Sequence, residues 1–356
     1  MREAVLIINN HAEYLAKQVK KLGYKVFYID NYNQNNLKKI LKKNFLHSFI
    51  KKIRKHCNLI KLIYGSGLED KQGIYEVLRS ETDIQGNDLE VLDFCNNILN
   101  LEKALNISGL QIPKTSIKPL PSKIKSIIKP LFSSGGLNIN FYKKDKNNFY
   151  YQEFIPGPTF SISFFIKKKK FFLLGYNRLF TLKNFHTNPF IHAGAMKIPK
   201  TKKFNEINNA VEIFSSIIGL KGYNNIDFKI FNNKVYVLDI NPRITSTFKI
   251  YNELYINNLL KSQINLTSNK TREIYNHSKR FYGFVHMFSK KNFKFYNRVK
   301  DDSSITNLPF EGEVIKKHHP IFTLNYSSNS PSSIINLLKK KINMTTQYYS
   351  CYDIDI

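Results

Sequence analysis

Five consecutive apolar residues near the start of the chain, 4–8 (AVLII), limit the fold more than any other feature. An uninterrupted apolar run predicts a strand that is buried on both faces, which is typical of parallel sheets covered by helices. A helical pattern over about 12–22 and two further strands, over 26–30 and 59–64, follow it. This alternation predicts an α/β fold whose first domain, residues 1–86, is a doubly wound, Rossmann-like parallel sheet.

The loops that follow these strands carry small and polar residues. Asn9 and Asn10 follow the first strand, and the turn Gly65-Ser66-Gly67 follows the third. Because parallel sheets bind ligands at the carboxyl ends of their strands, a ligand is expected at these loops. The same glycines are equally well explained as residues that only allow the chain to turn. Both interpretations stay open.

The pattern changes after residue 86. A helical connection is expected over 87–122, with helical periodicity over 87–110, and prolines then mark the transition to short strands in a domain over 123–275. A β-rich extension with a closing helix, near 332–341, is expected over 276–356.

The middle domain is expected to contain two hairpins, a helix and several single strands. One single strand is expected over 138–142. The first hairpin is expected over 161–166 and 170–176, the second over 226–231 and 234–240, and the helix over 205–218.

The second of these hairpins places two carboxylates together. Asp227 begins one strand, and Asp239 ends the other and runs into Asn241-Pro242-Arg243. Antiparallel pairing brings these strand ends within a few ångströms of each other. Two carboxylates side by side repel unless a cation lies between them, and oxygen ligands suit Mg²⁺. The alternative is a strand that simply ends in an ordinary turn.

A second motif lies upstream of this hairpin. Lys129 ends an apolar strand and precedes a small-residue loop that contains Gly135 and Gly136. Glycines allow successive backbone N–H groups to point at an anion, and a nearby lysine adds a point charge for phosphate. A Gly-Gly loop alone is more often only a turn, so the order of the motifs carries the argument.

That order resembles the ATP-grasp enzymes, a family that includes biotin carboxylase and D-alanine–D-alanine ligase. The Lys129 strand and the Gly135-Gly136 loop are similar to the family's lysine and its flexible phosphate-covering loop. The segment 151–157 resembles the hinge that binds adenine, and residues 239–243 (DINPR) resemble the metal-binding Glu-x-Asn-Pro-Arg signature. The resemblance implies an N-terminal domain followed by an ATP-grasp fold of two α+β subdomains.

The resemblance also implies roles for the matching residues. Lys129 would bind the α- and β-phosphates of ATP and Arg243 would hold an acyl phosphate, so these two are the expected catalytic residues. The implied cofactors are ATP and Mg²⁺ (or Mn²⁺). The residues implied to bind the nucleotide are Lys129, Gly135, Gly136, Glu153, Phe154 and Ile155, and those implied to bind the metal are Asp227, Asp239 and Asn241.

Segments outside this core extend the resemblance. Residues 4–30, 64–69 and 308–312 are similar to a branch described as predicted ATP-dependent carboligases. This implies a ligase that uses ATP to activate a small carboxylate as an acyl phosphate, which an amine then attacks to form a C–N bond. A narrower expectation, from the family alone, is a ligase in the synthesis of a one-carbon cofactor of the methanofuran or pterin type.

The chain departs from the family pattern at several positions. Asp239 replaces the usual glutamate and is one methylene shorter. Asn96-Asn97 stands where many members have a lysine, Thr159 where a ribose-binding glutamate is usual, and Asn225 where D-alanine-type ligases carry an arginine. These replacements keep open a different alternative: an ATP-grasp-like binding protein with weakened catalysis and a basic surface that associates with RNA.

The net charge of +29 raises the question of nucleic acid binding more generally. The 55 basic residues comprise 8 arginines and 47 lysines, although arginine is the residue that favours base and phosphate recognition. The lysines run along the whole chain beside Asn, Ile, Phe and Tyr, all of which have A/T-rich codons. Small-molecule substrates are therefore expected as partners, and nucleic acid is not.

Cysteines, apolar segments and histidines limit the remaining possibilities. Cys57, Cys95 and Cys351 are too widely separated for a disulfide framework or a metal site, so a cytoplasmic protein is expected. No apolar run reaches the ~20 residues of a bilayer span, so no membrane partner is expected, and a homodimer is compatible with the sequence. His186 and His192 flank the short segment 188–191 and either bind a metal or, as we favour, are loop or substrate-side histidines.

Overall fold

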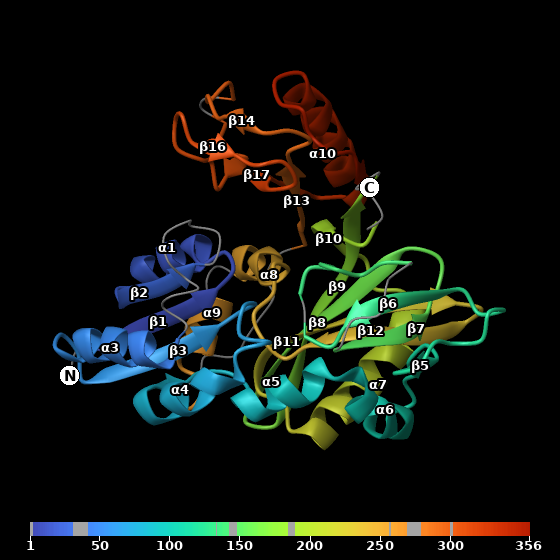
Figure 1. Ribbon diagram of the computed structural model, residues 1–356, viewed down its shortest axis with the longest axis horizontal. Helices are drawn as coiled ribbons and strands as arrows, with labels where there is room; N and C mark the ends of the chain where they lie inside the picture. The colour runs from blue at the N-terminus through green and yellow to red at the C-terminus, as the bar shows by residue number, and fades with distance from the viewer. Residues whose placement is uncertain are drawn as a thin grey trace.

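Figure 1 shows a computed structural model of the chain, which describes residues 3–30, 42–132, 134–141, 148–183, 189–255, 258–268, 279–299 and 302–356. The first of its two main sheets is parallel and has the strand order β2-β1-β3-β4. Its strands are β1 (Glu3–Asn9), β2 (Lys25–Asp30), β3 (Leu59–Tyr64) and β4 (Asp83–Ile84). The predicted parallel N-terminal sheet is confirmed.

Strand β1 lies in the interior of this sheet and is buried on both faces. Val5 and Ile7 pack with the apolar side of α1 (Glu13–Lys21), whereas Leu6 and Ile8 pack with α3 (Lys43–Arg54). Because side chains alternate across a strand, two covered faces require the unbroken apolar run that the sequence shows. The short helices η1 (Gln72–Ile74) and α4 (Tyr75–Glu81) follow β3.

Two helices connect the N-terminal sheet to the rest of the chain. The helical pattern predicted over 87–110 is divided into α5 (Leu89–Asn96) and α6 (Ile98–Ile107). Asn97 separates them because it has an extended backbone and its Oδ1 accepts a hydrogen bond of 3.1 Å from the N–H of Leu99. A side chain of this type favours the first position of a new helix over the interior of a longer one.

The second main sheet is antiparallel and contains nine strands in the described part of the chain. Eight of them follow the order β12-β11-β8-β9-β10-β13-β17-β15, and β18 pairs with β9. The strands are β8 (Thr159–Lys167), β9 (Lys170–Leu182), β10 (His192–Ile198), β11 (Gly222–Phe231), β12 (Lys234–Asn241), β13 (Phe281–Phe288), β15 (Ile305–Thr306), β17 (Pro320–Ser328) and β18 (Ile354–Asp355).

Both predicted hairpins are present in this sheet. Lys168 and Lys169 close the β8–β9 turn with φ values of +49° and +62°, and Asn232 and Asn233 close the β11–β12 turn with +47° and +59°. Two-residue turns with positive φ match the twist of the strands that they join. The predicted helix is α7 (Lys202–Ile218), which ends at Gly219 with a φ of +71°.

A small sheet of order β5-β7-β6 covers part of the large one. It consists of β5 (Thr115–Ser116), β6 (Ser126–Pro130) and β7 (Phe149–Glu153). The strand predicted over 138–142 is wrong for its described residues, 138–141, which make only one isolated bridge, between Ile128 and Asn140. Asn138 has a φ of +61°, which turns the chain out of the extended conformation.

The large sheet contains strands from both the predicted middle domain and the predicted C-terminal extension, because β13, β15, β17 and β18 pair within it. Helix α10 (Pro331–Thr346) contains the predicted closing helix and packs on β13 and β17. It begins at Ser330, whose hydroxyl accepts a hydrogen bond of 3.2 Å from the N–H of Ser333. A two-stranded pair, β14 (Phe293–Lys294) and β16 (Val314–Ile315), lies beside it (Figure 1).

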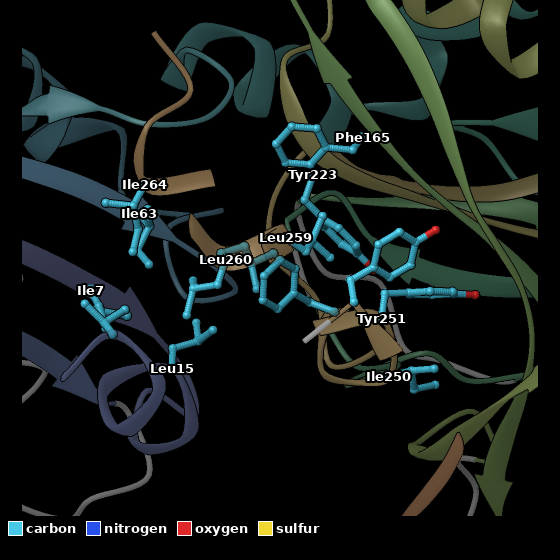
Figure 2. Packing of buried hydrophobic residues seen from close by; sticks show 14 of the residues in the cluster. Ile7, Leu15, Ile63, Phe165, Tyr223, Ile250, Tyr251, Leu259, Leu260 and Ile264 are labelled. Carbon is cyan, nitrogen blue, oxygen red and sulfur yellow. The ribbon is translucent and has the colours of Figure 1, made fainter. Parts of the chain in front are cut away.

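Apolar packing joins the parallel sheet to the antiparallel one. Helices α8 (Phe248–Leu254) and α9 (Asn258–Ile264) lie between the two sheets and share one buried cluster with both. Figure 2 shows part of this cluster, in which the labelled residues are Ile7, Leu15, Ile63, Phe165, Tyr223, Ile250, Tyr251, Leu259, Leu260 and Ile264. No helix in the described residues combines the length and apolar character needed to cross a membrane.

Strands β10 and β13 approach each other so closely at Gly194 that no side chain fits there. A Cβ added to Gly194 would lie 2.2 Å from the carbonyl oxygen of Phe284. We expect Gly194→Ala to lower the free energy of unfolding by about 1–3 kcal/mol, the usual cost of overpacking, measured by urea unfolding. Gly73→Ala is the matched control, because no heavy atom lies within 4 Å of its added Cβ. Equal losses in the two variants would contradict this account.

Candidate active site

One cavity of about 390 Å³ collects residues from both main sheets and the small one. The cavity is lined by Asn9, the last residue of β1, and by Asn10 and Ser66, from the loops after β1 and β3. The ligand-facing end predicted for the parallel sheet therefore does face a cavity. Every residue singled out for nucleotide, metal or catalysis also lines it: Lys129, Gly135, Gly136, Glu153, Phe154, Ile155, Asp227, Asp239, Asn241 and Arg243.

The two predicted metal carboxylates are direct cross-strand partners. Asp227 on β11 pairs with Asp239 on β12, and Asn225 pairs with Asn241. Residues two apart on a strand share a face, so Asp239 and Asn241 point to the same side. Burial, and then the charge of Asp239, raise the pKa of Asp227 to about 8, and burial raises the pKa of Asp239. Two carboxylates in this position are stable as anions only beside positive charge.

This donor set fits a magnesium ion. Mg²⁺ is usually held by one or two carboxylates together with substrate phosphates and water. Asp227 and Asp239 supply two carboxylates and Asn241 supplies an amide oxygen at the same cavity wall. Within the described ranges no group of three His, Cys, Asp or Glu side chains could hold a metal, so further ligands would have to come from phosphate or water.

Lys129 supplies positive charge beside the carboxylate pair. Its Nζ donates hydrogen bonds to the carbonyl oxygen of Leu238 at 2.8 Å and to Oε1 of Gln152 at 3.4 Å. Burial opposes the charged form of Lys129, but Tyr150 and the carboxylates of Asp239 and Asp227 outweigh it, so its pKa is raised. The ammonium group is therefore kept charged at the cavity wall, beside the carboxylate pair.

The glycine loop packs tightly against the chain before β10. The carbonyl oxygen of Gly135 accepts a hydrogen bond of 3.0 Å from the N–H of His192. A Cβ on Gly136 would lie 1.9 Å from the carbonyl oxygen of Phe190, and Gly136 has a φ of +77°. Only glycine allows this contact and this conformation. Ser133, in the same loop, lies outside the described residues.

The predicted adenine hinge covers the end of β7 and the residues after it, and it contacts a lysine on β11 that the sequence did not single out. The N–H of Phe154 donates to the carbonyl oxygen of Lys125 at 2.8 Å, so this backbone donor is already engaged. Lys229, two residues after Asp227, donates to the carbonyl oxygen of Ile155 at 2.7 Å, and its Nζ lies 5.1 Å from the Phe154 ring centroid. Burial lowers the pKa of Lys229 to about 8. In a chain with 47 lysines, no sequence signal distinguished this one.

Arg243 lies at the cavity, but it is paired within the protein. Its Nη2 forms an ion pair of 2.7 Å with Oε1 of Glu69, and both side chains are 6% exposed. Its Nε is buried and has no hydrogen-bond partner among the described residues. Oε2 of Glu69 accepts a further hydrogen bond of 2.6 Å from the N–H of Gly67. The turn after β3 thus fixes the arginine, a role that the sequence did not predict for Glu69.

The positions that depart from the family pattern have local roles. Asn97 caps α6, and Asn96 donates a hydrogen bond of 3.3 Å to the carbonyl oxygen of Glu69. Thr159 lines the cavity. Asn225 donates to the hydroxyls of Ser163 at 3.0 Å and Thr247 at 3.2 Å, so a neutral network replaces the charge of an arginine.

Three imidazoles line the part of the cavity near β13. The ring centroid of His286 lies 6.0 Å from that of His11 and 6.2 Å from that of His192. Burial lowers the pKa of all three, that of His192 to about 4, so the rings are neutral at pH 7. The described residues show no metal cluster here, and His186 lies outside them. The sequence did not single out His11 or His286, because these residues come together only in the folded chain.

The chain is similar to known proteins in sequence and in fold. Residues 95–247 match the family described as the ATP-grasp domain. Tyramine–L-glutamate ligase from Methanocaldococcus jannaschii is 29% identical over 235 residues, which are 65% of this chain and 71% of that protein.

Two solved structures show the same fold. L-amino acid ligase from Bacillus licheniformis superposes with a TM-score of 0.71 at 15% identity, over 96% of this chain and 97% of that one. The biotin carboxylase domain of the Hydrogenobacter thermophilus 2-oxoglutarate carboxylase, in complex with MgADP and bicarbonate, superposes with a TM-score of 0.76 at 12% identity, over 99% and 90%.

The raised carboxylate pKa values predict how metal-free stability depends on pH. The pKa of Asp227 is about 8 in the folded protein against an ordinary 3.8, so between these values the folded state keeps a proton that the unfolded state has lost. The free energy of unfolding in EDTA should therefore fall as the pH rises from about 4 to about 8. Asp239→Asn removes the like charge and should flatten this slope in urea unfolding. Parallel slopes for the parent and the variant would contradict the pairing.

The buried ion pair predicts a large effect of removing one partner. Arg243→Ala leaves Glu69 as an uncompensated buried charge and should lower the free energy of unfolding by about 3–5 kcal/mol. Combining it with Glu69→Leu should restore most of the loss. Arg79→Ala is the control, because its ion pair with Glu90 is more than half exposed on both sides and should contribute less than about 1 kcal/mol. If the single and double variants are equally destabilised, the pair does not act as described.

Proposed function

We propose that this chain, whose residues 95–247 match the ATP-grasp domain, is an ATP- and magnesium-dependent ligase that joins a small carboxylate to an amine. The observation that supports this most directly is the pairing of Asp227 with Asp239 in a cavity that also contains Lys129. Two facing carboxylates are costly in a protein interior, and binding a metal–nucleotide complex offsets that cost. The similar ligase from Methanocaldococcus jannaschii is named for a carboxylate and an amine substrate.

In this proposal each side chain has a separate task. Asp227, Asp239 and Asn241 would hold Mg²⁺, which would neutralise the negative charge that develops on the phosphate groups. Lys129 binds the α- and β-phosphates, and the hinge at Glu153, Phe154 and Ile155 receives the base. The loop of Gly135 and Gly136 covers the phosphates and excludes water, because acyl phosphates hydrolyse when wet.

The chemistry proceeds in two balanced steps. A carboxylate oxygen of the acid attacks the γ-phosphorus of ATP, and the bond to ADP breaks, which gives an acyl phosphate and ADP. The amine nitrogen then attacks the acyl carbon, loses a proton and expels phosphate, which forms the C–N bond. Arg243, held by Glu69, places a guanidinium beside the acyl phosphate, where it stabilises developing negative charge.

The proposed location is the cytoplasm. The three cysteines, Cys57, Cys95 and Cys351, are all buried free thiols, as suits a reducing compartment.

The test measures ADP and phosphate release with paired panels of carboxylates and amines, with and without Mg²⁺. Turnover should require ATP, Mg²⁺ and one acid–amine pair, and Asp239→Asn should abolish it while the variant stays folded. Asp355→Asn is the control for the loss of one carboxylate, because Asp355 forms a partly exposed ion pair with Lys183. Nucleotide binding without turnover for any pair would instead support the alternative of a binding protein with weakened catalysis.

A further inference from the structure

The cavity continues well beyond the carboxylate pair. In the large sheet, β8, β9 and β10 lie between β11, which carries Asp227, and β13, which carries His286. At about 4.8 Å per strand, these two strands are about 19 Å apart across the sheet. Both residues nevertheless line the same cavity. The part of the cavity near β13 therefore lies at a distance from the part where phosphoryl transfer is proposed.

Three parts of the chain meet in this second space, which we call the β13 chamber. It is lined by His11 and Tyr14 from the N-terminal sheet region, His192, Ser246 and Lys249 from the middle of the chain, and Phe284, His286 and Thr323 from the C-terminal strands. His286 and Thr323 share a hydrogen bond of 2.8 Å, and His192 and Ser246 share one of 3.1 Å. These hydrogen bonds hold neutral imidazoles in place around the chamber.

Lys249 on α8 contributes an ammonium group to the chamber. Its Nζ donates hydrogen bonds to Oδ1 of Asn325 at 2.6 Å and to the hydroxyl of Thr306 at 3.3 Å, and it lies 5.0 Å from the ring centroid of Tyr14. Asn325 is itself oriented, because its Nδ2 donates to the carbonyl oxygen of Ser304 at 3.0 Å. The partners that hold Lys249 are therefore all neutral, and its position is fixed before a ligand binds.

The carboxylates that line the cavity lie on its other side. Among the described lining residues they are Glu153, Asp227 and Asp239, on β7, β11 and β12. Within the described ranges, no carboxylate lies at ion-pair distance from the Nζ of Lys249. The carboxylate that acts electrostatically on Lys249 is that of Glu253, which favours the charged form of the lysine. Its Oε1 accepts a hydrogen bond of 2.8 Å from the hydroxyl of Tyr14. Burial lowers the pKa of Lys249 to about 8, so its charge is costly and still present at pH 7.

From this separation of charge, we propose that the β13 chamber binds a second anionic group of the acid substrate, with Lys249 as the residue that selects it. A half-buried ammonium held only by neutral acceptors is stabilised by an incoming anion. This inference rests on the proposed ligase function and narrows its substrate class. The acid carries one carboxylate that is activated beside Arg243 and a second carboxylate or phosphate that lies against Lys249.

The experiment compares dianionic acids with monoanionic ones of the same shape. Linear dicarboxylates from succinate to suberate are each paired with their monoamide and with the phosphonocarboxylate of equal length. Dissociation constants are measured by calorimetry on the parent, Lys249→Met, Lys249→Arg and the exposed control Lys339→Met. The parent should bind at least one dianion about 10-fold or more tightly than its monoamide, the effect of one charge-assisted hydrogen bond.

Lys249→Met should remove this preference, whereas Lys249→Arg and Lys339→Met should retain most of it. A preference for the phosphonate over the dicarboxylate of equal length identifies a phosphate as the second group, and the reverse identifies a carboxylate. If the parent binds each dianion and its monoamide equally, or if Lys249→Met keeps the preference, the inference is overturned. The comparison of each dianion with its monoamide uses only the parent protein, so it still tests the inference if Lys249→Met does not fold.

ADP release separates this inference from the function on which it rests. Dianion selectivity without ADP release for any acid–amine pair refutes the ligase and leaves the anion site. ADP release with monoanionic acids alone, at equal rates in the parent and Lys249→Met, supports the ligase and overturns the anion site.

Discussion

The pairing of Asp227 and Asp239 across two buried strands is the interaction on which the rest of the site depends. Like charges in a protein interior require nearby positive charge, and burial shifts both carboxyl groups toward the protonated form. Lys129 and Arg243 each act against that shift. Arg243 is itself buried and needs Glu69, which is held by the turn after β3. A series of oppositely charged side chains thus connects β12 to the N-terminal sheet.

That dependence explains why the domains must pack together before the site exists. The buried cluster around α8 and α9 holds the parallel sheet against the antiparallel one, which brings Glu69 to Arg243. The same helices carry Lys249 to Asn325, on a strand of the C-terminal part. The side of the cavity proposed to bind the nucleotide is built largely by the middle of the chain, whereas the β13 chamber is lined by all three parts. In this proposal, substrate selection is a property of the whole fold.

Local patterns predicted most of the elements correctly. The apolar run at residues 4–8 predicted a strand covered on both faces, and β1 is one. The hairpin over 226–231 and 234–240 was also predicted, and Asn232 and Asn233 between its strands have the positive φ that such a two-residue turn requires. The errors arose where one side chain or turn interrupts a pattern: Asn97 starts a new helix within 87–110, and Asn138 turns the chain where a strand was expected.

The sequence by itself determined the class of chemistry, because the order of Lys129, the glycine loop and the Asp-x-Asn-Pro-Arg strand end is local information that strand pairing converts into one cavity wall. Only the tertiary structure decided which of the 47 lysines matter, that Glu69 holds Arg243, and that His11, His192 and His286 meet. The reason is physical: hydrogen bonding along and between neighbouring strands follows from local spacing, whereas charge pairing and burial depend on distances between residues far apart in the chain.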